Sequence, residues 1–338
     1  MSESRRYPVL HFLGTSFLVL LLTLATAWAA AALYFDVRIA WLRIPLMLVY
    51  LASAVAVLFF GRHFWRRIGF GFLCFGVVLA WWLMLKPPQN ADWQEDVSRT
   101  AWGDDNGNIV TLHNVRLCDY RAEFDYTCQW QTRTVNLNNL RGLDLFLDYW
   151  GSPWIAHTIL SFDFGNDNRI AFSIEARKTV GQQYSAIRGF FRQFTLITVV
   201  SDERDVVRLR TNYRKDENLY LYHTTATIPF ARELFLNYVT LTNNLHAHPK
   251  WYNAVTDNCT TQIFALDAMS AQPRSWAILF NGKGDEMEYR LGNLATDGLS
   301  FDELERRAYI NPAAKAADQD PDFSERIRAG RPGFSQTP

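Results

Sequence analysis

The chain has 338 residues with 34 basic and 34 acidic side chains, and 49% of its residues are hydrophobic. The neutral total hides two parts of opposite charge, because residues 1–86 hold eight Lys or Arg and two Asp or Glu, which leaves 26 and 32 for the rest. The longer part is therefore acidic and gives no indication of a nucleic-acid partner, which requires a basic face. The length allows a membrane part followed by one or two globular domains.

Three uncharged apolar stretches open the chain, at residues 12–35, 44–60 and 68–85. Each can cross a hydrocarbon core of about 30 Å at about 1.5 Å per residue, the second only marginally. Five basic residues flank the spans on the N-terminal side of the membrane and three on the other side, which predicts a cytoplasmic N-terminus and a periplasmic location after residue 86. A cleaved signal peptide is the alternative for the first stretch, but its apolar run is long and two more spans follow.

The sequence after residue 86 predicts a mixture of strands and helices. Apolar alternation predicts strands near 109–117, 127–135, 155–164, 169–177, 194–200, 205–211 and 218–223, and helical spacing predicts helices near 139–149, 181–192, 229–246 and 259–270. We therefore expect a membrane anchor at 1–86 and an α+β domain at 87–310. The polar, Pro-containing residues 311–338 predict a loosely ordered tail.

Four cysteines are present. Cys74 lies in the third span, where packing is its expected role. Cys118 and Cys128 lie in two alternating segments that predict a hairpin, and an oxidising compartment would allow a disulfide between them. Cys259 is then the odd thiol, which favours a reactive role for it.

Cys259 lies in the run WYNAVTDNCTTQIF, where Asp257 or Asn258 is a suitable N-cap for the predicted helix. At the start of a helix, the dipole and the unpaired N–H groups lower the pKa of a thiol and can receive an oxyanion. The alternative is a buried packing cysteine.

A nucleophilic thiol requires a base, and His157 differs from the other histidines because it opens the strand HTILSFDF, whose partner is RIAFSIEAR. The apolar faces of both strands point to the core only if the numbers of residues paired across the strands add to an even value. For a loop of three or five residues that sum is 332 or 334. His157 then faces Glu175 or Arg177, and we favour Glu175 as the third member of a Cys-His triad. The alternative is an ordinary polar pair on an exposed sheet face.

Other charged and polar residues point to no cofactor. The run SDERDVVRLRTNYRK predicts a solvated ion-pair network, or alternatively a site for a lipid phosphate. The histidines and cysteines lack the spacing of a zinc site, and no Gly-rich nucleotide loop occurs.

Several segments together resemble the Lnb-type periplasmic domain family of bacterial proteins: LDLFLDYWGSPWIAHTILSFDF, IAFSIEARK, GFFRQFTLITVVSDERDVVRLRTN and WYNAVTDNCTT. The resemblance runs from about Trp93 to about Phe323. In its His-before-Cys order the family resembles permuted papain-like peptidases of the NlpC kind. Its named member is a lipoprotein N-acyltransferase, which moves an acyl chain from phospholipid to the α-amino group of a diacylglyceryl-modified cysteine.

The resemblance implies that Cys259 is the nucleophile and His157 the base, whereas Glu175 rests on strand pairing alone. The backbone N–H of Cys259 and the side chain of Asn258 would stabilise the oxyanion, with Tyr184 and Asn253 as further supporting candidates. The family's spans follow its soluble domain, whereas here they precede it, and Cys118 and Cys128 look like local additions.

The resulting expectation is a thiol acyltransferase anchored in the bacterial inner membrane, with phospholipid and a lipoprotein amine as substrates. A cysteine peptidase or amidase acting on cell-wall peptides is the first alternative, and a non-catalytic partner domain of the cell envelope is the second. An apolar cleft would favour lipid, and an open polar groove would favour peptide.

Overall fold

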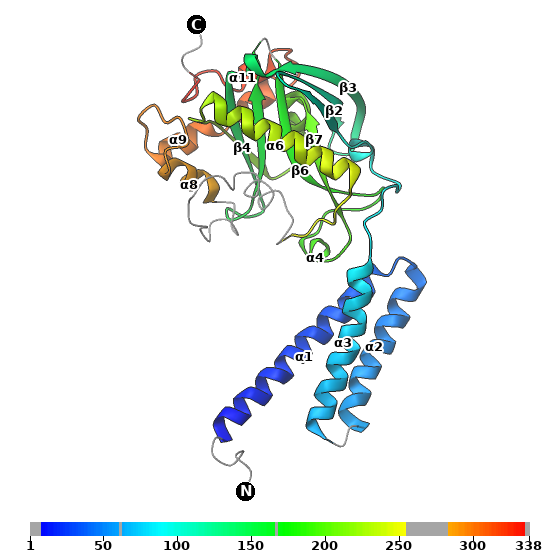
Figure 1. Ribbon diagram of the computed structural model, residues 1–338. Coiled ribbons are helices and arrows are strands. Elements are labelled where there is room, and N and C mark those ends of the chain that lie inside the picture. The colour runs from blue at the N-terminus through cyan, green and yellow to red at the C-terminus, as the bar shows by residue number, and fades with distance from the viewer. Residues whose placement is uncertain (1–7, 61–62, 166–167, 255–282, 335–338) are drawn as a thin grey trace. The chain divides into compact units, whose positions relative to one another are not determined.

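The computed structural model describes residues 8–60, 63–165, 168–254 and 283–334 (Figure 1). The chain divides into two compact units. The first comprises Met1–Pro87 with Ser185–Phe194, and the second comprises Pro88–Tyr184 with Thr195–Pro338. We refer to them as the helical unit and the sheet unit.

The helical unit contains three long apolar helices: α1 (Pro8–Asp36), α2 (Ala40–Phe60) and α3 (Phe64–Met84). Their candidate membrane spans are 26, 18 and 21 residues long, enough to cross a bilayer of about 30 Å. Small side chains on α1, Ala29 and Ala30, are buried against Tyr50 of α2 and Val78 of α3. Such residues let membrane helices approach closely.

The sheet unit is built on an eight-stranded sheet in the order β1-β2-β7-β6-β5-β4-β8, with β3 paired to β2. All of the strand pairs are antiparallel except β2 with β7. The strands are β1 (Trp102–Asn106), β2 (Ile109–Ala122), β3 (Asp125–Asn136), β4 (Gly142–Trp150), β5 (Ala156–Asp163), β6 (Arg169–Arg177), β7 (Thr195–Ser201) and β8 (Glu217–His223). The fold is therefore α+β, as the sequence predicts.

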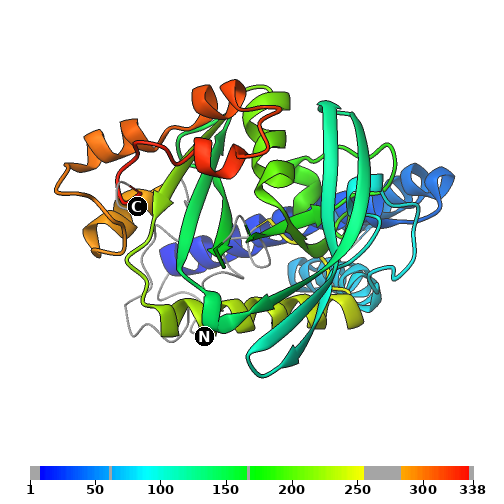
Figure 2. The ribbon, with the colours of Figure 1, turned by 90° about the horizontal axis from the view of Figure 1, so that it is seen from above.

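Short helices connect and cover the strands. They are η2 (Glu95–Val97), η3 (Leu137–Asn139), α4 (Ala186–Gly189), α5 (Glu203–Arg208), the π-helical η4 (Leu209–Tyr213), α6 (Ile228–Ala247), α8 (Gly284–Arg290), α9 (Phe301–Ala308), α10 (Asn311–Ala316) and α11 (Phe323–Arg326). Figure 2 shows α6 on one side of the central strands and the red C-terminal helices on the other. Both faces of the central sheet are therefore covered.

The face toward α6 is packed with aromatic rings. Phe235 of α6 lies 5.2 Å from Phe162 of β5 and 5.6 Å from Phe172 of β6, measured between ring centroids. Tyr238, one turn further along α6, lies 5.2 Å from Phe172. The alternation of the two strands places these rings together, because Phe162 and Phe172 lie on the same face of the sheet.

The opposite face is covered by α5, η4 and the C-terminal segment, and its apolar cluster includes Ile159, Val206, Phe323 and Ile327. A loosely ordered tail was expected from residue 311, but α10 and α11 form there, and Phe323 and Ile327 are fully buried. The reason is that a few widely spaced apolar residues in this polar segment complete the core of the sheet.

Two further predictions of secondary structure are wrong. The helix predicted over 139–149 is the strand β4, and the strand predicted over 205–211 is α5 followed by η4. In both cases charged side chains lie at buried positions: Asp144 and Asp148 are 3% and 1% exposed, and Arg210 is 2% exposed. Because these charged residues are buried, charge does not mark the solvent-exposed side of either segment, and the apolar pattern alone predicts the wrong element.

Cys118 and Cys128 lie directly opposite each other on β2 and β3 and form a disulfide. Both are buried beside Tyr120 of β2 and Leu209 of η4. Among the described cysteines, Cys74 in α3 is the free thiol.

Candidate functional site

The candidate site is centred on His157 at the start of β5. The β5–β6 register pairs Ile159 with Ser173 and Leu160 with Phe172, so paired residue numbers add to 332, one of the two values expected from the sequence. The same register points His157 and Glu175 toward each other, on the side of the sheet away from α6. Cys259 and Asn258 lie outside the described residues.

His157 is 8% exposed and belongs to a chain of polar contacts. Its Nε2 lies 2.7 Å from the Ser173 hydroxyl and 3.6 Å from Glu175 Oε1, and the Ser173 hydroxyl donates to the same carboxylate oxygen at 2.7 Å. The alternative of an exposed polar pair is therefore wrong for His157. Burial of a polar ring requires such partners.

The hydrogen bonds define the tautomer of His157. An ionised Glu175 can only accept, so the Ser173 proton points to Glu175 and the Ser173 oxygen accepts from Nε2–H. The lone pair of the neutral ring is then on Nδ1. No hydrogen bond reaches Nδ1 from within the described part of the chain. That nitrogen is the one suited to accept a proton.

Arg210 holds Glu175 from the other side. Its Nη2 donates to Glu175 Oε1 at 2.6 Å, its Nη1 donates to the carbonyl of Val206 at 2.8 Å, and its Nε lies 3.1 Å from Asp148 Oδ2. Burial alone would raise the pKa of Glu175, but Arg210, His157, Arg214 and the hydrogen bond from Ser173 together outweigh burial and hold the pKa well below its usual range. Glu175 is therefore an anion fixed in position.

Burial lowers the pKa of His157 to about 4, against the opposing pull of Glu175 and with a further lowering by Arg210. The ring is consequently neutral at pH 7. Glu175 Oε1, 3.6 Å from Nε2, is the carboxylate that would stabilise an imidazolium at this position. At neutral pH the ring is therefore in the form that can accept a proton.

Asp148 completes the cluster. It is directly opposite His157 in the β4–β5 register, and it is 1% exposed. Burial and the neighbouring carboxylate of Glu217 raise the pKa of Asp148 well above its usual range. Glu175, whose pKa is lowered, is therefore a stronger anionic partner for Arg210 than Asp148 is.

Tyr184 and Asn253, the other described candidates, lie outside the eight named strands, and Asn253 follows Trp251, which pairs with Thr195 at the start of β7. The hydroxyl of Tyr184 is 3.1 Å from that of Tyr252, and Tyr184 is 41% exposed. Asn253 follows Tyr252 and is half-buried. Asn253 thus precedes Cys259 by six positions, Tyr184 contacts the residue before Asn253, and the roles predicted for both stay predictions.

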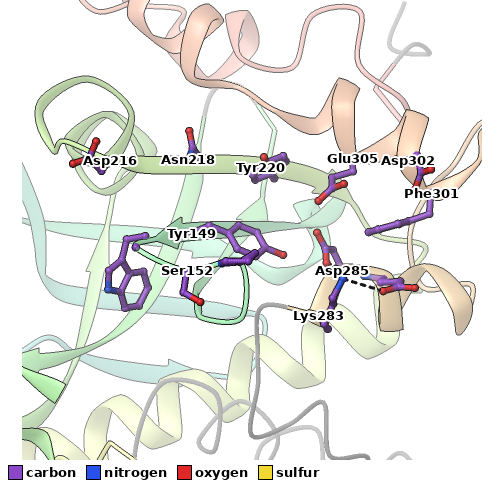
Figure 3. A pocket seen from close by; sticks show the side chains of 14 residues that line it. Tyr149, Ser152, Asp216, Asn218, Tyr220, Lys283, Asp285, Phe301, Asp302 and Glu305 are labelled. Atoms are coloured by element: carbon purple, nitrogen blue, oxygen red, sulfur yellow. Dashed lines mark hydrogen bonds and ion pairs between the residues drawn. The ribbon is translucent and has the colours of Figure 1, made fainter. Parts of the chain in front are cut away.

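A cavity of about 630 Å³ opens at the ends of β4 and β8 (Figure 3). Aromatic side chains line it together with five carboxylates, those of Asp216, Asp285, Glu286, Asp302 and Glu305, and the single amine of Lys283. Asp285 is 2% exposed and accepts a hydrogen bond from Tyr222 at 2.9 Å. The loop residues 151–153 form part of its wall and lead into β5 and His157. The cavity is polar and acidic rather than apolar.

Ser173 and Arg210 are site residues that sequence reasoning did not single out. Ser173 is two residues before Glu175 and therefore lies on the same face of β6, a signal that alternation provides. Arg210 belongs to the run expected to form a solvated network. Arg208 and Arg210 are each 2% exposed, so that expectation is wrong for these two side chains. Arg210 pairs with the half-buried Glu175, whereas Arg208 pairs with the exposed Asp119.

Metal ligands do not gather in the described ranges, where no group of three or more His, Cys, Asp or Glu side chains could hold an ion.

The fold and the site together define a membrane-anchored α+β protein with a buried His-Ser-Glu-Arg cluster. Residues 126–278 match the family described as the Lnb N-terminal periplasmic domain, which confirms the resemblance seen in the sequence, over a shorter stretch than 93–323. The match includes His157, Glu175 and Cys259. No curated protein and no solved structure matches the chain. The protein is thus anchored in a membrane and carries a periplasmic domain.

Proposed function

We propose that the protein is a thiol acyltransferase at the outer face of the bacterial inner membrane, with its N-terminus in the cytoplasm. The observation that carries the proposal is the neutral, buried His157, whose Nε2 is bound by Ser173 and backed by Glu175, so that Nδ1 is the proton acceptor. The membrane spans and the Lnb family match support a lipid substrate and an envelope location. The His-before-Cys order fits a permuted papain-like, NlpC-like arrangement.

The first step forms a thioester. His157 Nδ1 takes the proton of the Cys259 thiol, and the thiolate attacks the ester carbonyl of a phospholipid. Backbone N–H groups near Cys259 and the side chain of Asn258 stabilise the oxyanion, with Tyr184 and Asn253 in support. The ester C–O bond breaks, and the imidazolium returns its proton to the departing lysophospholipid oxygen.

The second step transfers the acyl group. The amine of a lipoprotein N-terminus attacks the thioester, the C–S bond breaks, and His157 removes the excess proton from the new amide nitrogen. Glu175 stabilises the imidazolium in both steps. Arg210 keeps Glu175 ionised and aimed at His157. No cofactor takes part in this scheme.

Hydrolysis of a cell-wall peptide or amide by the same residues is the second candidate. The acidic, aromatic cavity favours it, because a polar groove suits a peptide better than an acyl chain. In the transferase the same cavity would receive the peptide part of the acceptor. A non-catalytic partner domain is the third reading, and the His157 cluster counts against it, since an inert fold has no need of a buried base.

Intact-mass analysis of the full chain after incubation with phospholipid vesicles tests the proposal. The wild type should gain the mass of one acyl chain, lost again on treatment with hydroxylamine, whereas Cys259→Ala should gain none. Cys74→Ser is the matched control, because it removes the other thiol and should still acquire the adduct.

Three other outcomes lead away from acyl transfer. An adduct that persists in Cys259→Ala would reject the assigned nucleophile. No adduct, together with new amines released from peptidoglycan fragments by the wild type but not by Cys259→Ala, would establish the hydrolase. If Cys259 reacted with neither phospholipid, peptidoglycan fragments nor a thiol probe, the result would favour a non-catalytic partner domain.

A further inference from the structure

The connection between β6 and β7 contains a segment, Ser185–Phe194, that belongs to the helical unit and not to the sheet unit. We propose that this segment is an interfacial membrane anchor, with the side chains of Ile187 and Phe190 inserted at the boundary between lipid headgroups and acyl chains. The partner is the bilayer crossed by α1, α2 and α3. The proposal is independent of acyl transfer.

The segment is fastened to the C-terminal end of α1. The side-chain amide of Gln193 donates at 2.7 Å to both the carbonyl of Phe35 and the carboxylate of Asp36. The ring of Phe191 stacks on that of Phe35, with centroids 5.0 Å apart. Gln193 therefore binds one of the carbonyls left without a partner at the end of the helix.

Arg192 fastens the same segment to α3. Its guanidinium lies 4.0 Å above the ring of Trp82, and its Nη1 donates to the carbonyls of Leu83 and Leu85. A cation over an aromatic face and at the C-terminal end of a helix is favourable on both counts. The indole of Trp82 in turn donates to Asp36 at 2.7 Å, which joins the ends of α1 and α3.

These helix ends have the composition of a membrane interface. Asp36 and Lys86 supply charge where the apolar runs stop, and Tyr34 and Trp41 are 44% and 74% exposed nearby in the chain. Tyr and Trp gather at the headgroup level because their rings have an apolar body and a polar edge. A segment bound to these ends is therefore held at the depth of the headgroups.

The outward side of the segment is apolar and basic. Ile187 and Phe190 are 63% and 46% exposed, and their spacing of three residues puts them on one side of the α4 turn. Residues 185–194 contain two arginines and no acidic residue. Arg188 is exposed, and no ion pair to it occurs among the described residues. Apolar side chains flanked by basic ones are typical of segments that lie in an anionic lipid surface.

Spin labelling in lipid nanodiscs tests this placement. A background of Cys74→Ser and Cys259→Ala keeps the Cys118–Cys128 disulfide and removes the other thiols. Nitroxides are then attached singly at Ile187→Cys and Phe190→Cys. Leu73→Cys, on an exposed part of α3, is the lipid reference, and Phe124→Cys, 78% exposed between β2 and β3, is the second reference.

The measurement compares collision of each label with oxygen, which concentrates in lipid, and with a water-soluble nickel chelate. We expect labels at 187 and 190 to favour oxygen several-fold more than the label at 124, and less than the label at 73. Equal values at 187, 190 and 124 would overturn the proposal. Labels at 187 and 190 shielded from both reagents would also overturn it, because a protein surface would then cover the segment. Since Cys259 is absent from every variant, neither result depends on acyl transfer.

Discussion

The two faces of the sheet unit are buried to a similar degree by different means. Toward α6, Phe162 and Phe172 meet Phe235 through contacts between apolar rings. On the opposite face, ion pairs are buried among apolar side chains, as where Arg328 binds both Asp144 and Glu203 at 2.6 Å. Apolar packing tolerates small shifts, whereas a buried charge is stable only with its partner in place. The face that must fix the geometry of His157 is the one built from ion pairs.

The largest loss of stability is expected from removal of Arg328, the cation shared by Asp144 and Glu203 on the face of the sheet away from α6. Arg328→Ala leaves Asp144 and Glu203 buried without their common cation, which should lower the free energy of unfolding by about 4 kcal/mol. Denaturant unfolding of the detergent-solubilised chain, followed by tryptophan fluorescence, measures the loss. Arg326→Ala, whose side chain is 65% exposed in its pair with Asp320, should cost under about 1 kcal/mol. Equal losses would contradict the comparison.

A somewhat smaller effect is expected on the aromatic face. Phe235→Ala removes a fully buried ring and should cost about 3 kcal/mol, against under about 1 kcal/mol for the 40% exposed Phe230 on the same helix. The two faces should also differ in their response to pH. Arg328 holds the pKa of both Asp144 and Glu203 below the usual range in spite of burial, so the Arg328→Ala penalty should shrink as pH falls toward 4. If the loss of unfolding free energy in Phe235→Ala also shrank as pH fell toward 4, the two faces would not differ in their response to pH.

The next effect concerns His157. Its pKa is lowered from 6.5 to about 4 by burial, so the unfolded chain binds more protons between these values and stability should fall as pH falls through this window. Below pH 4 this difference in pKa should lower the free energy of unfolding by about 3 kcal/mol relative to its value above pH 6.5. His157→Gln should flatten this part of the stability curve, and an NMR titration of the histidine rings should find His157 neutral at pH 5.5. Protonation of that ring near pH 6.5 would contradict the cluster described above.

The smallest effect is expected for Ser173, whose hydroxyl joins His157 to Glu175. Ser173→Ala removes a neutral group and leaves both charges of the Glu175–Arg210 pair in place, so the cost should be about 1 kcal/mol in a thermal or denaturant melt. Ser300→Ala is the control, because Ser300 is exposed and its side chain makes no cap hydrogen bond. A loss as large as that of Arg328→Ala would contradict the role of Ser173 as a neutral link between two charged or polar partners.

The sequence predicted the parts of the fold that follow from simple periodicity. Alternation along β5 and β6 gave the facing residues, since one register kept Phe162 and Phe172 on one side and His157 and Glu175 on the other. The three spans followed from length and apolar composition. The α6 helix, predicted over 229–246, lies at Ile228–Ala247.

The errors over residues 139–149 and 205–211 have one physical cause. Asp144, Asp148 and Arg210 are charged residues in the core. Because charged residues are usually exposed, sequence reasoning assigns their positions to the surface, and the periodicity of the surrounding segments then predicts the wrong element. Their partners are far away in the chain, as with Asp144 and Arg328, which are 184 residues apart. Only the tertiary structure brings such partners together, so Arg210 could not be assigned to the site from local sequence.

That separation also affects how the protein is made. A chain is synthesised from its N-terminus, and domains begin to fold as they emerge. Asp144 lies in a central strand, yet Arg328 emerges 184 residues later. The charged face of the sheet therefore stays incomplete until residue 328 has emerged. Completion of the charged face of the sheet is consequently a late event in the synthesis of the chain.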